Sequence, residues 1–136
     1  AESLASQARN VQYHGLPGEL YTAQEVAAVG KTEKELKKEK IHYKIGKLPC
    51  LANSRAKVNN ETDGFVKILA DARTDKVLGV HIIGPHSGDM IAEMALGIEF
   101  GASAEYIART CHAHPSHTEA IKEAALSVDK RPIHFS

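Results

Sequence analysis

The sequence is short of the features that mark several common classes of protein. Its 136 residues include two cysteines, no tryptophan and only 5% aromatic residues, and 17 basic side chains balance 17 acidic ones. Nucleic-acid binding usually needs an excess of positive charge or a basic run interleaved with aromatics, and neither is present. No apolar run approaches the ~20 residues of a membrane-spanning helix, and the first residues show no charged-then-apolar leader. We therefore expect neither nucleic acid nor a membrane as a partner.

Metal-binding patterns are also scarce. Cys50 and Cys111 do not form a C-x-x-C pair or any other metal-type spacing, and two free thiols suit a reducing compartment. The eight histidines are the unusual count, but only His112 and His114 stand at a ligand-like spacing. Two imidazoles without further ligands make a weak zinc site. The sequence therefore predicts no metal and no cofactor for this chain.

The composition that is present favours one globular domain. Hydrophobic residues make up 43% and charged residues 25%, which is typical of a folded chain with a sizeable core. We expect a flexible lead-in over residues 1–10 and a single domain over residues 11–136. Alternation and turn signals predict strands over 19–22, 26–30, 42–48, 65–70 and 77–83, the last two as an antiparallel hairpin. Residues 53–57 are predicted to continue extended or to form an irregular edge.

Helical patterns fall mainly in the second half of the chain. Capping signals and apolar periodicity predict helices over 32–40, 87–101, 103–110 and 116–128. Ser87 and Asp89 are alternative N-caps for the second of these. A block of strands followed by a block of helices predicts an α+β fold, in which an antiparallel sheet has helices packed on one face.

One stretch, residues 111–119, concentrates reactive groups. It holds three imidazoles, a thiol, two hydroxyls and a carboxylate in nine residues, at a point where Pro115 stiffens a loop before a helix. Ser116 and Glu119 have the spacing of a capping box, which gives both a complete structural role without any chemistry. His117 then begins the apolar face of the helix that follows.

Several segments together resemble a known family. They are residues 21–22, 25–33, 52–56, 62–67, 78–85 and 111–115. They resemble the C-terminal interface domain of dihydrolipoamide dehydrogenase, one of the flavin-dependent disulfide oxidoreductases, and the likeness runs from about residue 11 to 135. The resemblance implies an α+β interface fold and a homodimer. It also implies that the FAD and nicotinamide domains and the redox-active cysteine pair are missing here, and that a natural parent works in the cytoplasm or the mitochondrial matrix.

The resemblance also implies roles for two residues. In the whole enzyme, the residue matching His114 is the base that faces the reactive thiol of the other subunit, and the one matching Glu119 orients it. Such a carboxylate fixes the imidazole tautomer and raises its basicity. The first hypothesis is therefore an isolated interface domain, a subunit-pairing module or scaffold without dehydrogenase activity.

Some residues depart from the family pattern. Cys50 stands where an aromatic is usual and His117 where a Leu or Met is usual, while Glu19, Gln24 and Tyr106 also differ. Trading a buried Phe for a smaller residue typically costs ~3 kcal/mol or more. Exposure of once-buried positions explains the polar changes, with His117 as an exposed residue at a helix start. It does not explain Cys50, whose plainest interpretation is a small core hydrophobe.

The alternative hypothesis is an engineered or repurposed cysteine hydrolase. Cys50 would be the nucleophile, His117 or His114 the base, and a small ester the substrate. The imidazole would take the thiol proton, the thiolate would attack the ester carbonyl, and amides at the start of the last helix would stabilise the oxyanion.

Overall fold

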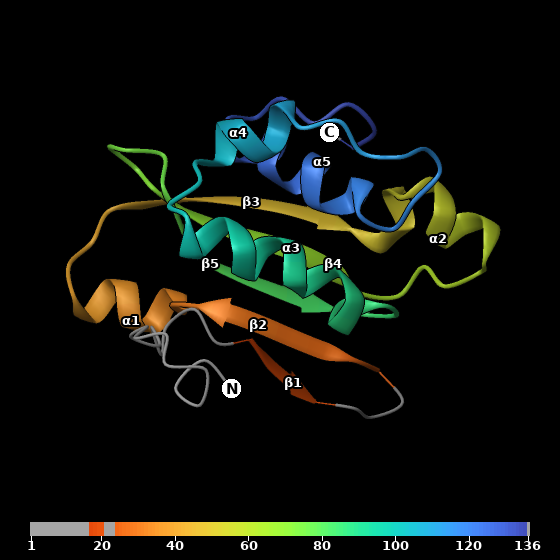
Figure 1. Ribbon diagram of the computed structural model, residues 1–136, viewed down its shortest axis with the longest axis horizontal. Helices are drawn as coiled ribbons and strands as arrows, with labels where there is room; N and C mark the ends of the chain where they lie inside the picture. The colour runs from red at the N-terminus through yellow and green to blue at the C-terminus, as the bar shows by residue number, and fades with distance from the viewer. Residues whose placement is uncertain (1–16, 21–23, 136) are drawn as a thin grey trace, which may run out of the picture.

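The computed structural model describes residues 17–20 and 24–135, and its main feature is a five-stranded antiparallel sheet with helices over one face (Figure 1). The predicted α+β class is confirmed. The predicted lead-in over residues 1–10 and the end of the first predicted strand, residues 21–22, lie outside the described residues. In the described part of the chain, no helix combines the length and the apolar character that crossing a bilayer requires.

The strands lie in the order β1-β2-β5-β4-β3. Their bounds are β1 Gly18–Leu20, β2 Val26–Gly30, β3 Tyr43–Pro49, β4 Phe65–Asp71 and β5 Val77–Ile83. The predicted hairpin of the last two strands is confirmed, because β4 pairs antiparallel with β5 from Phe65 opposite Ile83 onward. β3 and β2 are then added on either side, also antiparallel.

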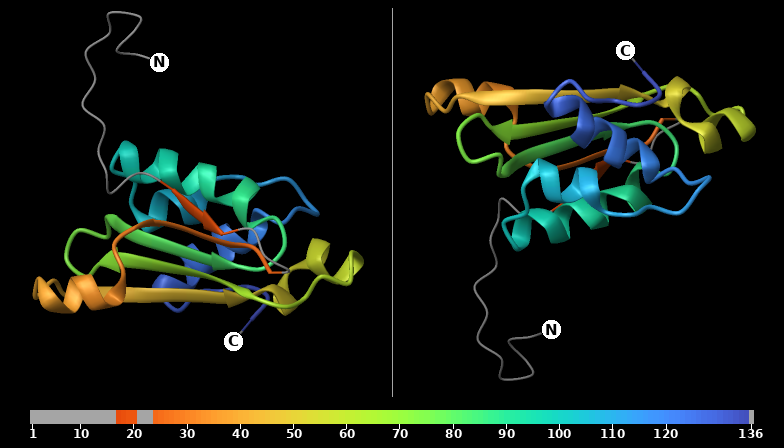
Figure 2. Two further views of the ribbon diagram at one scale, coloured as in Figure 1. Left: turned by 90° about the horizontal axis from the view of Figure 1, so that it is seen from below. Right: turned by 90° about the horizontal axis from the view of Figure 1, so that it is seen from above.

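The helices are α1 Glu33–Lys38, the 3-10 helix η2 Cys50–Ala52, α2 Ser54–Val58, α3 Ser87–Glu99, α4 Ala104–Arg109 and α5 Glu119–Val128. Of these, α3, α4 and α5 form a second layer over one face of the sheet (Figure 2). α3 covers β2 and β5, α5 covers β3 and β4, and α4 packs against α5. α1 and α2 lie at opposite ends of the sheet (Figure 1).

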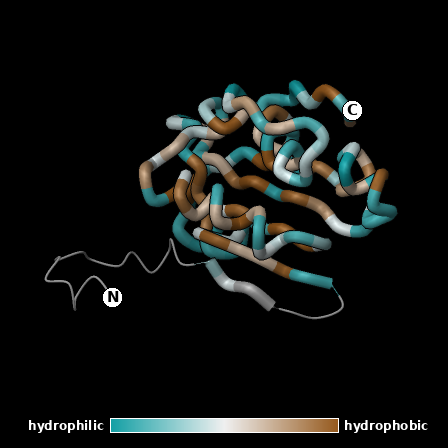
Figure 3. Tube along the Cα trace, turned by 45° about the vertical axis from the view of Figure 1, so that its right-hand side comes forward, coloured by the Kyte–Doolittle hydropathy of each residue, from teal (hydrophilic) through white to brown (hydrophobic). Residues whose placement is uncertain are grey.

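The core lies between these two layers, and hydrophobic residues run along the central strands (Figure 3). Val66 and Ile68 of β4 and Ile121 of α5 are fully buried there. α5 sits directly on β3, since a Cβ added at Gly46 would lie 2.0 Å from the Ala124 carbonyl oxygen. Glycine is therefore needed at position 46 for close packing of helix on strand.

The extended edge predicted over residues 53–57 is wrong, because this segment forms α2. The buried Asn53 is its N-cap, and the side-chain oxygen accepts a hydrogen bond from the Ala56 amide at 2.9 Å. Such a bond satisfies one of the free amides in the first helical turn. By contrast, the capping box predicted for α1 is confirmed, with Thr32 and Glu35 bonding each other's backbone amides.

Two predicted helix N-caps need correction. α3 begins after His86, whose φ of 64° places it in the left-handed region, and Ser87 instead donates its hydroxyl to the Gly84 carbonyl. α5 begins at Glu119, and its N-cap is Thr118, two residues after the predicted cap Ser116. Only half of the capping box predicted for Ser116 and Glu119 forms. The Glu119 carboxylate accepts from the Ser116 amide at 2.9 Å, but the Ser116 hydroxyl contacts the Thr118 hydroxyl and not the Glu119 amide.

Candidate functional site

The corner between α4 and α5, residues 110–118, lies beside α2 at one end of the sheet (Figure 1). α2 and its cap hold the corner by side-chain bonds to its backbone. Asn53 donates to the Ser116 carbonyl at 3.0 Å, and Arg55 donates to the Pro115 carbonyl at 3.2 Å. α2, which was not predicted from the sequence, therefore positions the stretch of reactive groups over residues 111–119.

His114 and Glu119 form a pair at the outer side of this corner. The imidazole Nδ1 lies 3.0 Å and 3.2 Å from the two carboxylate oxygens of Glu119. The His114 side chain is 68% exposed, and no described residue hydrogen-bonds to its Nε2. One ring nitrogen is thus fixed by a carboxylate while the other faces outward.

Glu119 is suited to orient that imidazole. Burial alone would raise its pKa, but the hydrogen bonds from the Ser116 amide and from His114 outweigh this and lower the pKa below its ordinary value. The carboxylate is therefore ionised at neutral pH and accepts from both neighbours. The contact that the resemblance implied is present, while the catalytic roles of the two residues stay a prediction.

His112 faces the other way, into the protein. Its side chain is only 6% exposed, with Nε2 2.6 Å from Glu93 of α3 and Nδ1 3.0 Å from the Thr110 carbonyl. Both ring nitrogens therefore have acceptors within the chain. His112 anchors the corner to α3, and the two residues His112 and His114 do not share a ligand site.

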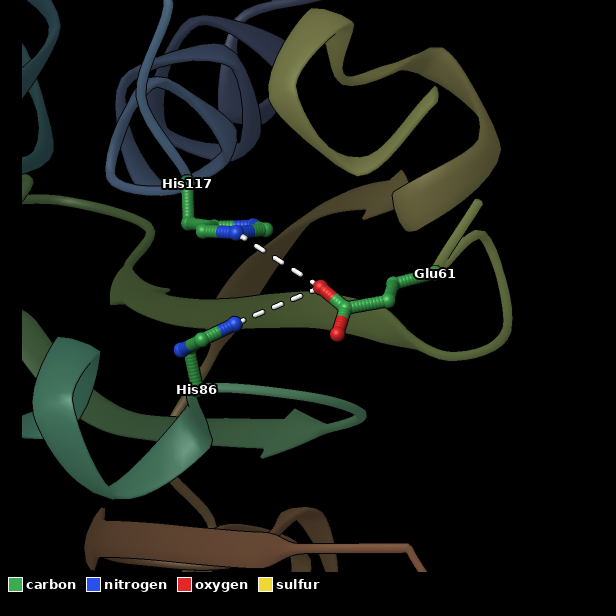
Figure 4. A group of neighbouring side chains, drawn as sticks. All are labelled: Glu61, His86 and His117. Atoms are coloured by element: carbon green, nitrogen blue, oxygen red, sulfur yellow. Dashed lines mark hydrogen bonds and ion pairs between the residues drawn. The ribbon is translucent and has the colours of Figure 1, made fainter. Parts of the chain in front are cut away.

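His117 belongs to a second cluster, which joins three segments (Figure 4). Its ring stacks on that of His86, with centroids 4.2 Å apart and planes inclined by 25°. Glu61 Oε2 lies 3.3 Å from His86 Nε2 and 3.9 Å from His117 Nε2. Burial, helped by the nearby charge of His86, lowers the pKa of His117 although Glu61 opposes the shift.

Glu61 and His86 were not predicted from the sequence as members of this cluster. Glu61 follows α2, His86 lies in the turn before α3, and His117 lies just before α5. No spacing in the sequence links such distant segments. The only available signal was the histidine count itself, together with His117 as a departure from the family pattern.

Cys50 is not brought into contact with an imidazole. Cys50 is 6% exposed, and the hydrogen-bond acceptor of its thiol is the Ile83 carbonyl, 4.0 Å from Sγ. No described histidine lies within hydrogen-bond distance of Sγ. Burial raises the pKa of the thiol, and the nearby Asp63 adds to the effect. Both observations disfavour a thiolate at neutral pH.

Residues 16–125 match one family, described as the dimerisation domain of pyridine nucleotide-disulphide oxidoreductases. The chain belongs to this family. Its α+β sheet and its 111–115 corner are therefore those of a dimerisation domain, as the resemblance implied.

Named relatives agree with this assignment. The chain is 54% identical over 128 residues to dihydrolipoyl dehydrogenase 3 of Pseudomonas putida, covering 94% of this chain and 28% of that protein. It is 53% identical over 134 residues to mitochondrial dihydrolipoyl dehydrogenase 1 of Arabidopsis thaliana, covering 98% and 26%.

Solved structures share the fold. The crystal structure of LpdA from Mycobacterium tuberculosis superposes with a TM-score of 0.83 at 25% identity, over 91% of this chain and 27% of that one. The flavoprotein disulfide reductase RclA from Escherichia coli gives a TM-score of 0.80 at 23% identity, over 88% and 28%. The chain thus spans about a quarter of the length of the proteins that it matches.

Proposed function

We propose that this chain is the subunit-pairing part of a flavin-dependent disulfide oxidoreductase and has no dehydrogenase activity by itself. Its membership of a dimerisation-domain family supports the pairing role. The dehydrogenase activity in the names of its relatives is that of proteins about four times as long. In this proposal, the chain contributes to such an activity only as part of a longer protein.

Within such an enzyme, His114 is the proposed base and Glu119 the residue that positions it. The observation that carries this proposal is the asymmetry of the imidazole. Nδ1 is held by the Glu119 carboxylate at 3.0 Å, whereas Nε2 lies on a side chain that is 68% exposed. A ring anchored on one side and open on the other is arranged to exchange a proton with a group on another chain or domain.

Exposed apolar side chains on the helix layer support pairing with a second copy. Leu96 and Phe100 at the end of α3 are 61% and 74% exposed, and Tyr106 of α4 is 70% exposed. Large apolar side chains gathered on a surface typically mark an interaction site. We propose that they are covered when two copies pair.

Sedimentation velocity tests this proposal on the purified chain. The wild type should sediment as a dimer, and the double variant Leu96→Glu with Phe100→Glu should sediment as a monomer, because buried unpaired carboxylates oppose association. Ile45→Glu is the matched control. Ile45 is 44% exposed and lies next to Gly46, which faces α5, so its side chain points to the face of the sheet away from the helices. A monomeric wild type, or a double variant that still dimerises, would contradict the proposal.

The cysteine hydrolase is a separate proposal, and the geometry gives it no support. It requires a thiolate beside an imidazole, whereas Cys50 is buried with a raised pKa and has a carbonyl as its neighbour. Turnover of p-nitrophenyl acetate by the wild type and by Cys50→Ala tests it directly. Equal rates would end the hypothesis, and a loss of turnover in Cys50→Ala would revive it.

A further inference from the structure

Glu61, His86 and His117 form a cluster that the pairing role does not use. One ligating atom from each residue can be chosen so that all three lie within 4.8 Å of one another. No other group of three His, Cys, Asp or Glu side chains in the described residues meets this condition. We propose that these three side chains bind one divalent metal ion of the zinc class, through two imidazole nitrogens and one carboxylate oxygen.

The distances between the ligating atoms fit such an ion. Zinc lies about 2.0–2.2 Å from imidazole nitrogen and carboxylate oxygen, so neighbouring ligand atoms in a tetrahedral site lie roughly 3.4 Å apart. His86 Nε2 is 3.3 Å from Glu61 Oε2, which already matches. His117 Nε2 is 3.9 Å from the same oxygen, and it has to close by only roughly half an ångström.

Asn59 indicates which nitrogen of the His117 ring carries the lone pair. Its side-chain nitrogen lies 3.2 Å from Glu61 Oε2, an obligatory acceptor, so the amide points its NH₂ group into the cluster. The same nitrogen lies 3.4 Å from His117 Nε2. A donor at this distance makes Nε2 the acceptor, and an acceptor nitrogen is the form of imidazole that binds a metal.

The stacked rings have to open when the ion enters. Lone pairs lie in the ring planes, and two planes inclined by only 25° do not converge on a single point. In the proposed site, each ring turns about its Cβ–Cγ bond until its nitrogen faces the ion beside the carboxylate. The side chains of Glu61 and His86 are 37% and 41% exposed, which leaves room for that rotation, an entry path and water as the remaining ligand.

The ion would tie together the loop after α2, the turn before α3 and the corner before α5 (Figure 4). That corner also carries His114, three residues before His117. Metal binding at this site would therefore restrict the backbone that presents the exposed imidazole. The inference does not depend on the pairing role, because all three ligands belong to one chain.

Isothermal titration of the purified chain with Zn²⁺ tests the proposal, with Co²⁺ absorption in the visible range as a report on coordination. The wild type should bind one equivalent. His117→Gln and Glu61→Gln should each bind at least ~100-fold more weakly, since even the loss of an outer-shell partner costs 10–100-fold. His86→Asn should behave in the same way, and Asn is chosen because it tolerates the left-handed φ of 64° at this position.

His134→Gln is the matched control, because His134 also contacts one carboxylate, Glu123, at 2.9 Å but has no third ligand. It should bind Zn²⁺ as the wild type does. Thermal unfolding with EDTA establishes that each variant folds, and Zn²⁺ should raise the midpoint only in the wild type and the control. A wild type that takes up no Zn²⁺, or affinity that survives in both His117→Gln and Glu61→Gln, would overturn the proposal.

Discussion

Two imidazoles three residues apart, on the same corner of the fold, have opposite surroundings. His114 is 68% exposed and has one partner, the carboxylate of Glu119. His117 is 18% exposed and is surrounded by the His86 ring, Glu61 and Asn59. The open pair, His114 with Glu119, leaves a ring nitrogen for a group outside this chain. The closed cluster, Glu61, His86 and His117, has its interaction partners within the chain. Neighbours, and not position in the sequence, thus set what each histidine can do.

The two thiols also differ in their exposure. Cys111 is exposed and lies near the start of the corner formed by residues 110–118, whereas Cys50 is buried. A Cβ added at Gly84, two residues before His86, would lie 3.4 Å from the Cys50 sulfur. The thiol that can meet a reagent is therefore the one that the sequence did not select as a nucleophile.

The largest expected effect concerns the open pair. In a complete enzyme that carries this sequence as its dimerisation domain, His114→Gln should lower kcat by roughly 10²–10⁴-fold, because this is the usual contribution of a positioned acid or base. Steady-state assays of dihydrolipoamide oxidation measure it. His134→Gln, another exposed imidazole beside a carboxylate, should leave kcat unchanged. Equal kcat values for His114→Gln and the wild type would remove the proposed role.

Alkylation compares the two thiols. At neutral pH, iodoacetamide should modify Cys111 faster than Cys50 by on the order of tenfold or more, because burial both shields Cys50 and raises its pKa. Peptide mass spectrometry over a time course gives the two rates separately. Faster modification of Cys50 would contradict the burial of its thiol and would favour the hydrolase hypothesis.

Glu119 provides a smaller, pH-dependent effect. Glu119→Gln should lower the free energy of unfolding by about 1 kcal/mol at pH 7, as the loss of a capping interaction usually does. The pKa of Glu119 is lower in the folded state than its ordinary value of 4.5. The stabilisation is therefore present above pH 4.5 and is lost as the pH falls through the folded-state pKa.

Urea unfolding at a series of pH values measures this difference. The curves of wild type and Glu119→Gln should converge in acid. Glu99→Gln, on the exposed end of α3, should stay within about 0.5 kcal/mol of the wild type at neutral pH, as expected for a surface substitution. A constant difference between wild type and Glu119→Gln at all pH values would show that the charge of Glu119 is not what stabilises the corner.

The sequence predicted the parts of the fold that depend on local patterns. The β4–β5 hairpin and the α1 capping box follow from alternation and from residues three positions apart, and both are confirmed. α2 was missed because its polar segment lacks an apolar period, and a single buried amide of Asn53 starts it. The family resemblance located the corner, but not the helix that holds it.

The closed cluster could not be predicted in the same way. Glu61, His86 and His117 come from three loops that are far apart in the sequence and approach each other only in the folded chain. The burial of Cys50 also depends on packing between distant segments, Gly84 among them. Contacts of this kind are set by tertiary structure, so the family resemblance indicated both members of the open pair, whereas only His117 of the closed cluster was singled out from the sequence.

Asn59 gives the smallest expected effect and the sharpest view of what holds the closed cluster together. Its exposed side chain donates at 3.2 Å to Glu61 and lies 3.4 Å from His117. If ring stacking and burial hold His117, Asn59→Ala should cost no more than about 0.5 kcal/mol in urea unfolding, as for most surface substitutions. Lys57→Ala, on the exposed side of α2, is the control. A loss clearly above 1 kcal/mol would instead make this amide the organiser of the cluster, since net contributions of that size are typical of hydrogen bonds shielded from water.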